Sequence, residues 1–424
     1  MADSLFEDLS WRNVIAQVTD AEAVRTLLDG EPFSFYCGFD PTAPSLEFGN
    51  LVQLVTMRRL QLAGHRPIAV VGGATGLIGD PSGKSAERNL NPVEVVEEWV
   101  GRIRRQVERI LSFDGENAAQ IVDNLEWTAP MSAIDFLRDI GKHFGVSRML
   151  AKESVSARLE AGGISYTEFS YQILQSLDYL ELHRRYQCVL QTGGSDQWGN
   201  LTAGVDLIRR VDGATVQALA TPLITRADGT KYGKTATGAV WLDPEMMSPF
   251  AFYQYFLNQA DADVGPLLRT FSFRSHQEIE TLEADAASQP EQRLGQRALA
   301  GELTSLVHGA DAAEDAIAAS RALFGQGELA ELDARTLEVA LAEVPHASLP
   351  AAGELPPLLD LIVSSGLVDS RGAAKRALAE GGIYLNNRRV TDGVVPVARS
   401  ELLHGRWLVL RRGKRSIAAA EVMP

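Results

Sequence analysis

The sequence has only two cysteines among its 424 residues, Cys37 and Cys188. This number excludes a disulfide framework and a cysteine-rich zinc site. No stretch approaches the roughly 18 consecutive apolar residues that cross a membrane. The acidic first residues also lack the basic and apolar regions of a signal peptide. We therefore expect a reduced, soluble protein of the cytoplasm without a membrane partner.

Patterns typical of metal ligands and nucleophiles are also missing. The seven histidines are scattered, no two of them form an H-x-x-x-H pair, and there is no G-x-S-x-G motif. We expect no resident metal ion and no tightly bound cofactor. The composition is 45% hydrophobic and 22% charged, which excludes a disordered or fibrous chain.

Charge is distributed unevenly along the chain. The formal net charge is −15, yet residues 366–417 contain eleven Lys and Arg against four Asp and Glu. A chain that is acidic overall is not a general nucleic-acid coat, but a local basic segment can bind one. This asymmetry predicts a separate C-terminal module with an anionic partner.

Short apolar runs that read as strands alternate with helical patterns in the first half of the chain. The expected strands span residues 34–39, 67–71, 120–124 and 188–191. The expected helices span residues 49–63, 92–111, 131–144 and 167–181, with Asn91 as N-cap of the second. The alternation predicts an α/β fold with a parallel sheet covered on both faces. Ligands bind such sheets beyond the carboxyl ends of the strands.

The composition divides the chain into four segments. We expect an α/β domain over 1–247, a helical domain over 248–325, an acidic linker over 326–355 with room for one helix, and a basic module over 356–424. No internal repeat is found.

Two Gly-rich motifs follow the first two predicted strands. In residues 36–50, glycines allow backbone to approach a ligand, and the helix start offers amides to phosphate. In residues 72–84, Asp80 suits a substrate ammonium, and Lys84 with nearby Arg88 suits phosphates. The alternatives are a plain strand-to-helix turn and a flexible surface loop.

Three further motifs lie between residues 171 and 235. Tyr171, Gln175 and Asp178 share one face of an apolar helix, so they need a polar partner unless that face meets solvent. Asp196, after a strand and Gly-Gly, suits ribose hydroxyls or an N-cap. The lysines in 228–235 suit a clamp on polyphosphate, or the tip of a solvated hairpin.

Taken in order, these motifs resemble bacterial tyrosyl-tRNA synthetases, a family of class I aminoacyl-tRNA synthetases. The matching segments are residues 36–42, 72–81, 136–144, 167–171, 193–200 and 231–235. The basic tail resembles an RNA-binding module of this family, of a ribosomal protein and of some pseudouridine synthases, on residues 370–376, 381–386 and 410–415. The resemblance covers essentially the whole chain. It implies a Rossmann-like catalytic domain and a small α+β RNA-binding module.

The resemblance also implies roles for individual residues. L-Tyrosine would be bound by Tyr36 and Asp178 at the phenol, by Asp80, Tyr171 and Gln175 at the ammonium group, and by Asn124, Gln191 and Gln197 elsewhere. ATP, with Mg²⁺, would contact Cys37, Gly38, Asp40, Gly49, Asn50, Gly194, Asp196 and Lys234. The catalytic set would be Lys84, Arg88, Lys231, Lys234, Thr235 and Thr42. The tail would bind tRNA(Tyr) through Arg371, Lys375, Arg376, Arg388, Arg389, Arg411 and Arg412.

One segment departs from the family's pattern. The HIGH-type signature reads Glu47-Phe-Gly-Asn50 here. Asn50 can donate a hydrogen bond as a neutral histidine does. A carboxylate that faces phosphate costs roughly 4 kcal/mol at 4 Å and a dielectric constant of about 20. We hypothesise that Glu47 turns away, and that Thr42 and the loop lysines contact the phosphates.

Two alternatives remain at this point. The departure leaves room for an RNA-binding or regulatory protein, or a specialised paralogue, with a weakened synthetase site. A class I enzyme for tryptophan is the other, although Tyr36 and Asp178 offer two hydrogen-bonding groups to one hydroxyl and so favour tyrosine. The resemblance further implies a homodimer, with residues 131–150 as the expected interface.

Overall fold

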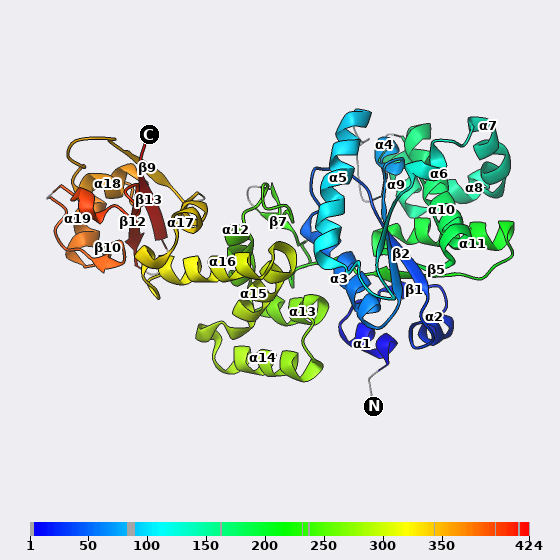
Figure 1. The fold of residues 1–424 in the computed structure, drawn as a ribbon, viewed down its shortest axis with the longest axis horizontal. Helices are drawn as coiled ribbons and strands as arrows, with labels where there is room; N and C mark the ends of the chain where they lie inside the picture. The colour runs from blue at the N-terminus through cyan, green and yellow to red at the C-terminus, as the bar shows by residue number, and fades with distance from the viewer. Residues whose placement is uncertain are drawn as a thin grey trace. The chain divides into compact units, whose positions relative to one another are not determined.

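The computed structural model describes residues 4–82, 90–161, 163–230, 232–235, 238–342, 344–394, 396–413 and 416–423. They form two compact units, each described by itself (Figure 1). The first unit comprises Met1–Met246 and Gln259–Leu299, and the second comprises Met247–Asn258 and Ala300–Pro424. Residues 259–299 thus group with the first unit, although their sequence suggested a helical domain. The functional domain boundaries stay predictions.

A six-stranded sheet forms the centre of the first unit. Its strands are β1 (Gln17–Val18), β2 (Ser34–Phe39), β3 (Arg66–Val71), β4 (Gln120–Asp123), β5 (Cys188–Gly194) and β6 (Gln217–Thr221). Their order is β1-β6-β5-β2-β3-β4, and only the pair β1 and β6 is antiparallel. The predicted parallel α/β sheet is therefore confirmed.

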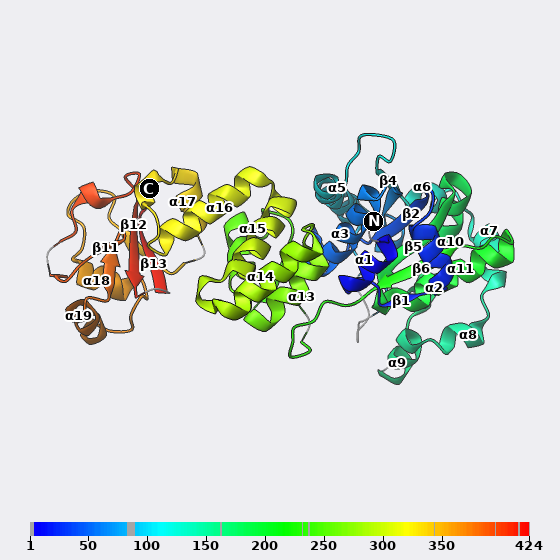
Figure 2. The same ribbon diagram turned by 90° about the horizontal axis from the view of Figure 1, so that it is seen from below.

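Helices cover both faces of this sheet, as both ribbon views show (Figures 1 and 2). One face carries α3 (Phe48–Leu62) and α5 (Val93–Ile110), and the other carries α10 (Tyr166–Tyr186) and α11 (Trp198–Val211). Apolar residues repeat on one side of α5, so Val96, Ile103 and Val107 are buried. Its N-cap is Pro92 rather than the expected Asn91.

Shorter elements complete the first unit. Its other elements are α1 (Leu5–Trp11), α2 (Ala21–Leu28), α4 (Thr75–Ile78), α6 (Leu125–Thr128), α7 (Ala133–Asp135), η1 (Phe136–Ile140), η2 (Gly141–His143), α8 (Val146–Leu150), α9 (Glu153–Ala161), η3 (Ser195–Gln197), β7 (Lys234–Thr235), β8 (Gly238–Ala239), α13 (Asp261–Phe271), α14 (His276–Ser288) and η4 (Pro290–Gln292). Helix α15 (Leu294–His308) crosses the unit boundary. The single helix expected over 131–144 is a succession of α, π and 3₁₀ turns.

Two buried arginines attach the end of α13 to the first unit. Arg12 donates to the carbonyls of Ser272 at 2.9 Å and Arg274 at 2.8 Å. Arg59, on α3, donates to the carbonyls of Thr270 at 2.6 Å and Ser272 at 2.7 Å. A helix end leaves carbonyls without helical partners, and the two guanidinium groups bond to carbonyls in the last turn of α13 and just beyond it. These bonds explain why residues 259–299 belong to this unit.

The second unit contains a smaller sheet between two layers of helices. Its strands, in the order β11-β10-β12-β13-β9, are β9 (His346–Leu349), β10 (Ile383–Leu385), β11 (Arg388–Arg389), β12 (Trp407–Arg412) and β13 (Ser416–Val422). Its helical elements are α12 (Pro249–Leu257), α16 (Ala310–Leu323), η5 (Leu329–Glu331), α17 (Ala334–Leu341), α18 (Leu358–Ser364), α19 (Arg371–Ala379) and η6 (Arg399–Glu401).

Alternating residues of β12 pack into two different hydrophobic cores. Leu408 and Leu410 pack with α18 and α19, whereas Trp407 and Val409 pack with α12, α16 and α17. The stretch 326–355, expected to be a linker, supplies α17 and the strand β9, which pairs in parallel with β13. Among the described residues, no helix is long and apolar enough to span a bilayer.

Candidate functional site

A cavity of about 460 Å³ opens beyond the carboxyl ends of β2 and β5. The chain continues from β2 to β3 on one side and returns through β5 to β6 on the other, so these two strands flank the topological switch point. All predicted tyrosine and nucleotide residues whose side chains are described line this one cavity. They are Tyr36, Cys37, Gly38, Asp40, Thr42, Gly49, Asn50, Asp80, Asn124, Tyr171, Gln175, Asp178, Gln191, Gly194, Asp196 and Gln197.

Asp178, a residue of α10, is buried in the wall that this helix forms. Its two carboxylate oxygens accept hydrogen bonds from Asn124 Nδ2 at 3.0 Å and from Trp127 Nε1 at 2.8 Å. Burial outweighs these bonds and raises the pKa of Asp178 to about 7. The carboxylate is thus fixed in position but poorly solvated, which favours a ligand that donates a hydrogen bond to it.

Three buried polar atoms around this cavity have no hydrogen-bond partner among the described residues. They are Tyr36 Oη, Gln175 Oε1 and Gln191 Oε1. Burial, and after it the nearby Asp178 carboxylate, raise the pKa of the Tyr36 phenol well above its usual value. Buried polar groups in folded proteins nearly always have partners. A polar ligand in this cavity would supply them.

Carboxylates dominate the described lining of the cavity. Asp40 accepts hydrogen bonds from Tyr171 Oη at 2.6 Å and Thr75 Oγ1 at 2.7 Å. Asp80 accepts from Gln197 Nε2 at 2.6 Å. The described lining residues include no Lys, Arg or His. The field there favours an ammonium group, and a polyphosphate needs cations from elsewhere.

Adjacent residues of β2 face opposite sides of the sheet. Tyr36 packs toward α10, with its ring centroid 5.2 Å from that of Tyr179, whereas Cys37 Sγ lies 3.8 Å from Gln53 Oε1 on α3. Burial raises the pKa of the Cys37 thiol to about 12, so it stays neutral. The cavity therefore has two chemically distinct sides.

Gly38, in β2, and Gly49, in α3, are open toward the cavity. A Cβ added at Gly38 or Gly49 would meet no heavy atom within 4 Å. A Cβ at Gly72 would instead lie 2.2 Å from Asp40 Oδ1, so that position requires glycine. The open backbone at Gly38 and Gly49 leaves room for a ligand to approach closely, as the sequence suggested.

Glu47 is the N-cap of α3, and it forms a capping box with Asn50 in the first turn of the helix. Asn50 Oδ1 accepts from Glu47 N at 2.9 Å, and Asn50 N donates to Glu47 O at 2.8 Å. Glu47 also forms an isolated bridge with Trp241. The Glu47 side chain is exposed at the mouth of the cavity. The amide oxygen of Asn50 thus caps the helix, and the role of Glu47 toward phosphate stays a prediction.

The predicted cationic loops are described in part. Lys84, Arg88 and Lys231 lie outside the described residues, and for Lys234 and Thr235 only the backbone, in β7, is described. Nearby, Tyr232 Oη donates to Gln259 Oε1 at 2.8 Å, and Ala227 N donates to Asp263 Oδ1 at 2.7 Å. These two bonds connect the residues before and after 228–231 to the residues around the start of α13.

Sequence reasoning missed Trp127 as a site residue. Its only signal is that it follows Asn124 by three residues, on the same side of the short helix α6. Its indole is buried and donates to Asp178. A hydrogen bond to a residue 51 positions away in the chain leaves no local pattern.

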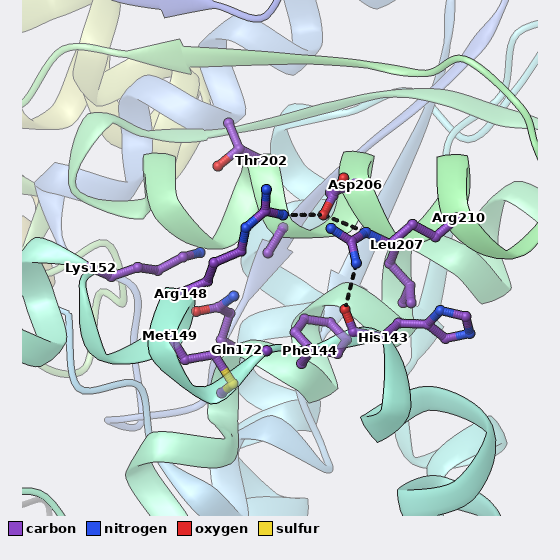
Figure 3. Close-up of a pocket in the computed structure, with 12 residues that line it drawn as sticks. His143, Phe144, Arg148, Met149, Lys152, Gln172, Thr202, Asp206, Leu207 and Arg210 are labelled. Carbon is purple, nitrogen blue, oxygen red and sulfur yellow. Dashed lines mark hydrogen bonds and ion pairs between the residues drawn. The ribbon is translucent and has the colours of Figure 1, made fainter.

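A second cavity of about 170 Å³ lies between α8, α10 and α11 (Figure 3). Asp206 is its central carboxylate, 2.8 Å from Arg210 Nε and 3.5 Å from Arg148 Nη1. Burial lowers the pKa of the nearby Lys152 to about 8. None of the predicted site residues lines this cavity.

The predicted RNA-binding residues differ in exposure. Six of them are exposed: Arg371, Lys375, Arg376, Arg388, Arg389 and Arg412. Arg411 is buried, with 7% of its surface exposed. In the described part of the chain, no group of three His, Cys, Asp or Glu side chains is arranged to hold a metal ion.

The chain is similar to known proteins along its whole length. It is 60% identical over 422 residues to the tyrosine–tRNA ligase of Streptomyces griseus, covering 99% of each chain. It is 59% identical over 422 residues to that of Acidothermus cellulolyticus, covering 98% of this chain and 99% of the relative. The structure matches a C-terminally truncated mitochondrial tyrosyl-tRNA synthetase of Aspergillus nidulans with a TM-score of 0.68 and 27% identity, covering 74% of this chain and 92% of that one.

Two family profiles match consecutive parts of the sequence. The tRNA synthetases of class I (W and Y) match residues 28–325, and the tyrosine–tRNA ligase SYY-like C-terminal domain matches residues 336–419. The second match begins inside the expected linker, where α17 lies. The chain belongs to the class I tRNA synthetases of the tryptophan and tyrosine group, and carries the C-terminal domain of its tyrosine–tRNA ligases.

Proposed function

We propose that this protein is a tyrosine–tRNA ligase, which activates L-tyrosine with ATP and transfers the tyrosyl group to the 3′-terminal adenosine of tRNA(Tyr). The observation that carries this function is the buried Tyr36 hydroxyl, without a partner among the described residues, near the fixed carboxylate of Asp178. The relatives named tyrosine–tRNA ligase do not favour a regulatory protein with a decayed site.

The amino-acid side of the cavity suits tyrosine group by group. The substrate phenol donates to Asp178 and accepts from Tyr36, so phenylalanine would leave both groups buried and unpaired, which costs free energy. The substrate ammonium is bound by Asp80, Tyr171 and Gln175, in the part of the cavity where carboxylates dominate. Asn124, Gln191 and Gln197 orient the remaining atoms.

The nucleotide side suits ATP, which enters with Mg²⁺ as part of the substrate. Cys37, Gly38, Gly194 and Asp196 contact the ribose, and Gly49 and Asn50 lie at the start of α3, where amides attract phosphate. Asp40 and Thr42 lie toward the phosphates. Because the described lining lacks cations, Lys84, Arg88, Lys231 and Lys234 supply the positive charge that the triphosphate needs, and Thr235 supplies a hydroxyl donor.

The first step is an in-line substitution at phosphorus. A carboxylate oxygen of tyrosine attacks the α-phosphorus, the bond to the bridging oxygen breaks, and pyrophosphate leaves with the electron pair. The loop cations stabilise the pentavalent phosphate and the departing pyrophosphate. The cavity contributes by holding both reactants close together, so no protein nucleophile is required.

Two further proposals concern partners. The exposed arginines and lysine of the C-terminal module bind tRNA phosphates, so affinity falls as salt rises. Ile134, Leu137, Val146 and Leu150 are 40–68% exposed and lie within or beside the expected interface. Such an apolar surface supports a homodimer through 131–150. We also propose a cytoplasmic location.

The test is ATP–pyrophosphate exchange with tyrosine, phenylalanine and tryptophan side by side. We expect exchange that depends on tyrosine and is far weaker with the other two. Equal exchange with phenylalanine would contradict the phenol pocket. Absence of exchange with all three, in a protein that still binds tRNA, would support the regulatory alternative instead.

A further inference from the structure

Arg411 and its neighbour Arg412 carry the same charge but differ in burial and in contacts. Arg412 is exposed, whereas Arg411 is buried on the face of β12 that packs against the helices α16 and α17. The Arg411 guanidinium lies 4.1 Å from the ring centroid of Tyr384, its cross-strand neighbour on β10. It also donates to the carbonyl of Gly413. A buried guanidinium stacked on an aromatic ring is not available to an RNA phosphate.

The Arg411 guanidinium lies against the C-terminal end of α16. That helix ends at Leu323, and Gly325 follows with a φ of +79°. A Cβ at Gly325 would lie 2.9 Å from Arg411 Nη2, which shows how close the guanidinium is to the helix end, and the positive φ favours glycine there. Helix C-termini carry partial negative charge, which a cation stabilises.

The turn between β10 and β11 caps the same helix end. Asn387, whose φ is +64°, donates from Nδ2 to the carbonyl of Ala322 at 2.6 Å and to that of Gly327 at 3.3 Å. Both carbonyls lie at the end of α16 or just beyond it. Ala322 also belongs to the apolar core shared with Val409 of β12. The helix end is thus bonded by Asn387, lies close to the Arg411 guanidinium and packs against the sheet.

We propose that Arg411, Tyr384 and Asn387 form a junction, here called the α16 junction, that fixes the C-terminal sheet to α16. Its function is positional: it holds the exposed basic residues of the module in one orientation, and Arg411 itself does not contact RNA. This inference rests on the proposed binding of tRNA by the module. It reassigns Arg411 from the predicted RNA-contact set to the set of positioning residues.

The experiment compares Arg411→Gln, Asn387→Gly and the matched control Arg412→Gln in the full-length protein. Amide hydrogen exchange at residues 322–327 reports the junction, because the amides of Gly325 and Gln326 bond to Ala322 and Arg321 across the helix end. Affinity for tRNA(Tyr), measured at several salt concentrations, reports binding. Glycine tolerates the φ of Asn387, so Asn387→Gly tests the junction in a folded protein even if Arg411→Gln destabilises it.

We expect both junction variants to exchange faster at 322–327 and to bind tRNA roughly 5- to 100-fold more weakly, the usual range for coupled sites. The double variant should be no weaker than the worse single variant. Arg412→Gln should leave amide hydrogen exchange at 322–327 unchanged. It should reduce the slope of log tRNA affinity against log salt concentration by about one. Pyrophosphate exchange should be unaffected in all of them.

Two outcomes would overturn the proposal. One is an Arg411→Gln variant that lowers the salt slope by about one with unchanged amide exchange, while Asn387→Gly binds tRNA normally. The other is faster amide exchange in both variants with unchanged tRNA affinity. A wild-type protein that fails to bind tRNA would count against the proposed function, and the amide exchange would still report whether the junction exists.

Discussion

The cavity of the first unit and the basic surface of the second use charge in opposite ways. Asp178 is buried and fixed by Asn124 and Trp127. The cations of α19 are exposed, and Arg371 pairs with the half-buried Asp360. A buried charge has lost its water and accepts only a group that replaces it well. Exposed charges bind any extended polyanion with little geometric demand. Selection of one ligand therefore requires a buried charge, whereas nonspecific attraction of a polyanion does not.

The largest effect should come from changing the buried carboxylate of Asp178. We expect Asp178→Asn to lower kcat/KM for tyrosine in pyrophosphate exchange by roughly 10- to 100-fold, because a hydrogen bond to a charged group is worth about 1.5–3 kcal/mol. Arg412→Gln, which changes an exposed cation of the second unit, should leave kcat/KM for tyrosine in pyrophosphate exchange unchanged. A loss below threefold for Asp178→Asn would contradict the assigned role.

Removing exposed charges should instead affect tRNA alone. In the triple variant Arg371→Gln, Lys375→Gln and Arg376→Gln, we expect the slope of log affinity against log salt to fall by roughly two to three, because fewer counterions are released. Pyrophosphate exchange should not change. This variant is sharper than deletion of 356–424, which would remove the partner strand of β9. An unchanged slope would exclude α19 from the RNA surface.

A smaller effect should follow from Trp127→Phe. The change removes one donor from Asp178 and keeps an aromatic ring in place. We expect the KM for tyrosine to rise roughly 2- to 10-fold with little change in kcat, since a net hydrogen bond is worth about 0.5–1.5 kcal/mol. The control is Trp11→Phe, because Trp11 stacks on His276 outside the lining of the cavity. Equal effects of the two variants would refute the positioning of Asp178 by Trp127.

The raised pKa of Asp178 predicts a pH dependence of stability in the empty enzyme. Between about pH 4 and pH 7 the folded state binds a proton that the unfolded chain has released, so this contribution to stability is present at low pH and is lost as pH rises through about 7. Asp178→Asn lacks it. The melting temperature of the wild type minus that of the variant should therefore fall from pH 5 to pH 8. A difference that is flat or rises would contradict a buried, poorly solvated carboxylate.

The smallest effect is expected at Glu47. Its side chain is exposed, and its part in the start of α3 is a capping box with Asn50, so Glu47→Ala should change pyrophosphate exchange less than about threefold, as for most surface substitutions. Lys231→Ala provides the reference for a true phosphate contact. A loss that approaches that of Lys231→Ala would refute a bystander role for Glu47.

Local patterns predicted the sheet and most of the cavity. Apolar runs and helical spacing located β2, β3, β4 and β5, and the polar residues after these strands do line one cavity. This succeeded because the carboxyl ends of parallel strands converge at one edge. The motif order alone could not have placed Tyr171 near Asp40, but helical periodicity did place it beside Gln175 and Asp178.

Features that depend on distant pairings were missed. The strand β9 pairs with β13 from within an acidic, Pro-rich stretch, and nothing local marks it as part of a sheet. The burial of Arg411 depends on where α16 ends, almost ninety residues earlier in the chain. Charge counting treats Arg411 and Arg412 alike, because composition carries no information about which side of a strand meets a core.

The alternation of Tyr36 and Cys37 along β2 has a consequence for how the two substrates meet. In the proposed binding mode this strand separates the two substrates, with the amino acid on one side and the nucleotide on the other, and the reacting carboxylate and phosphate come together past its open end. Inserting one residue ahead of Tyr36 would exchange these two side chains between the compartments. In this binding mode, the register of β2 in the sheet sets the direction from which the two substrates approach each other.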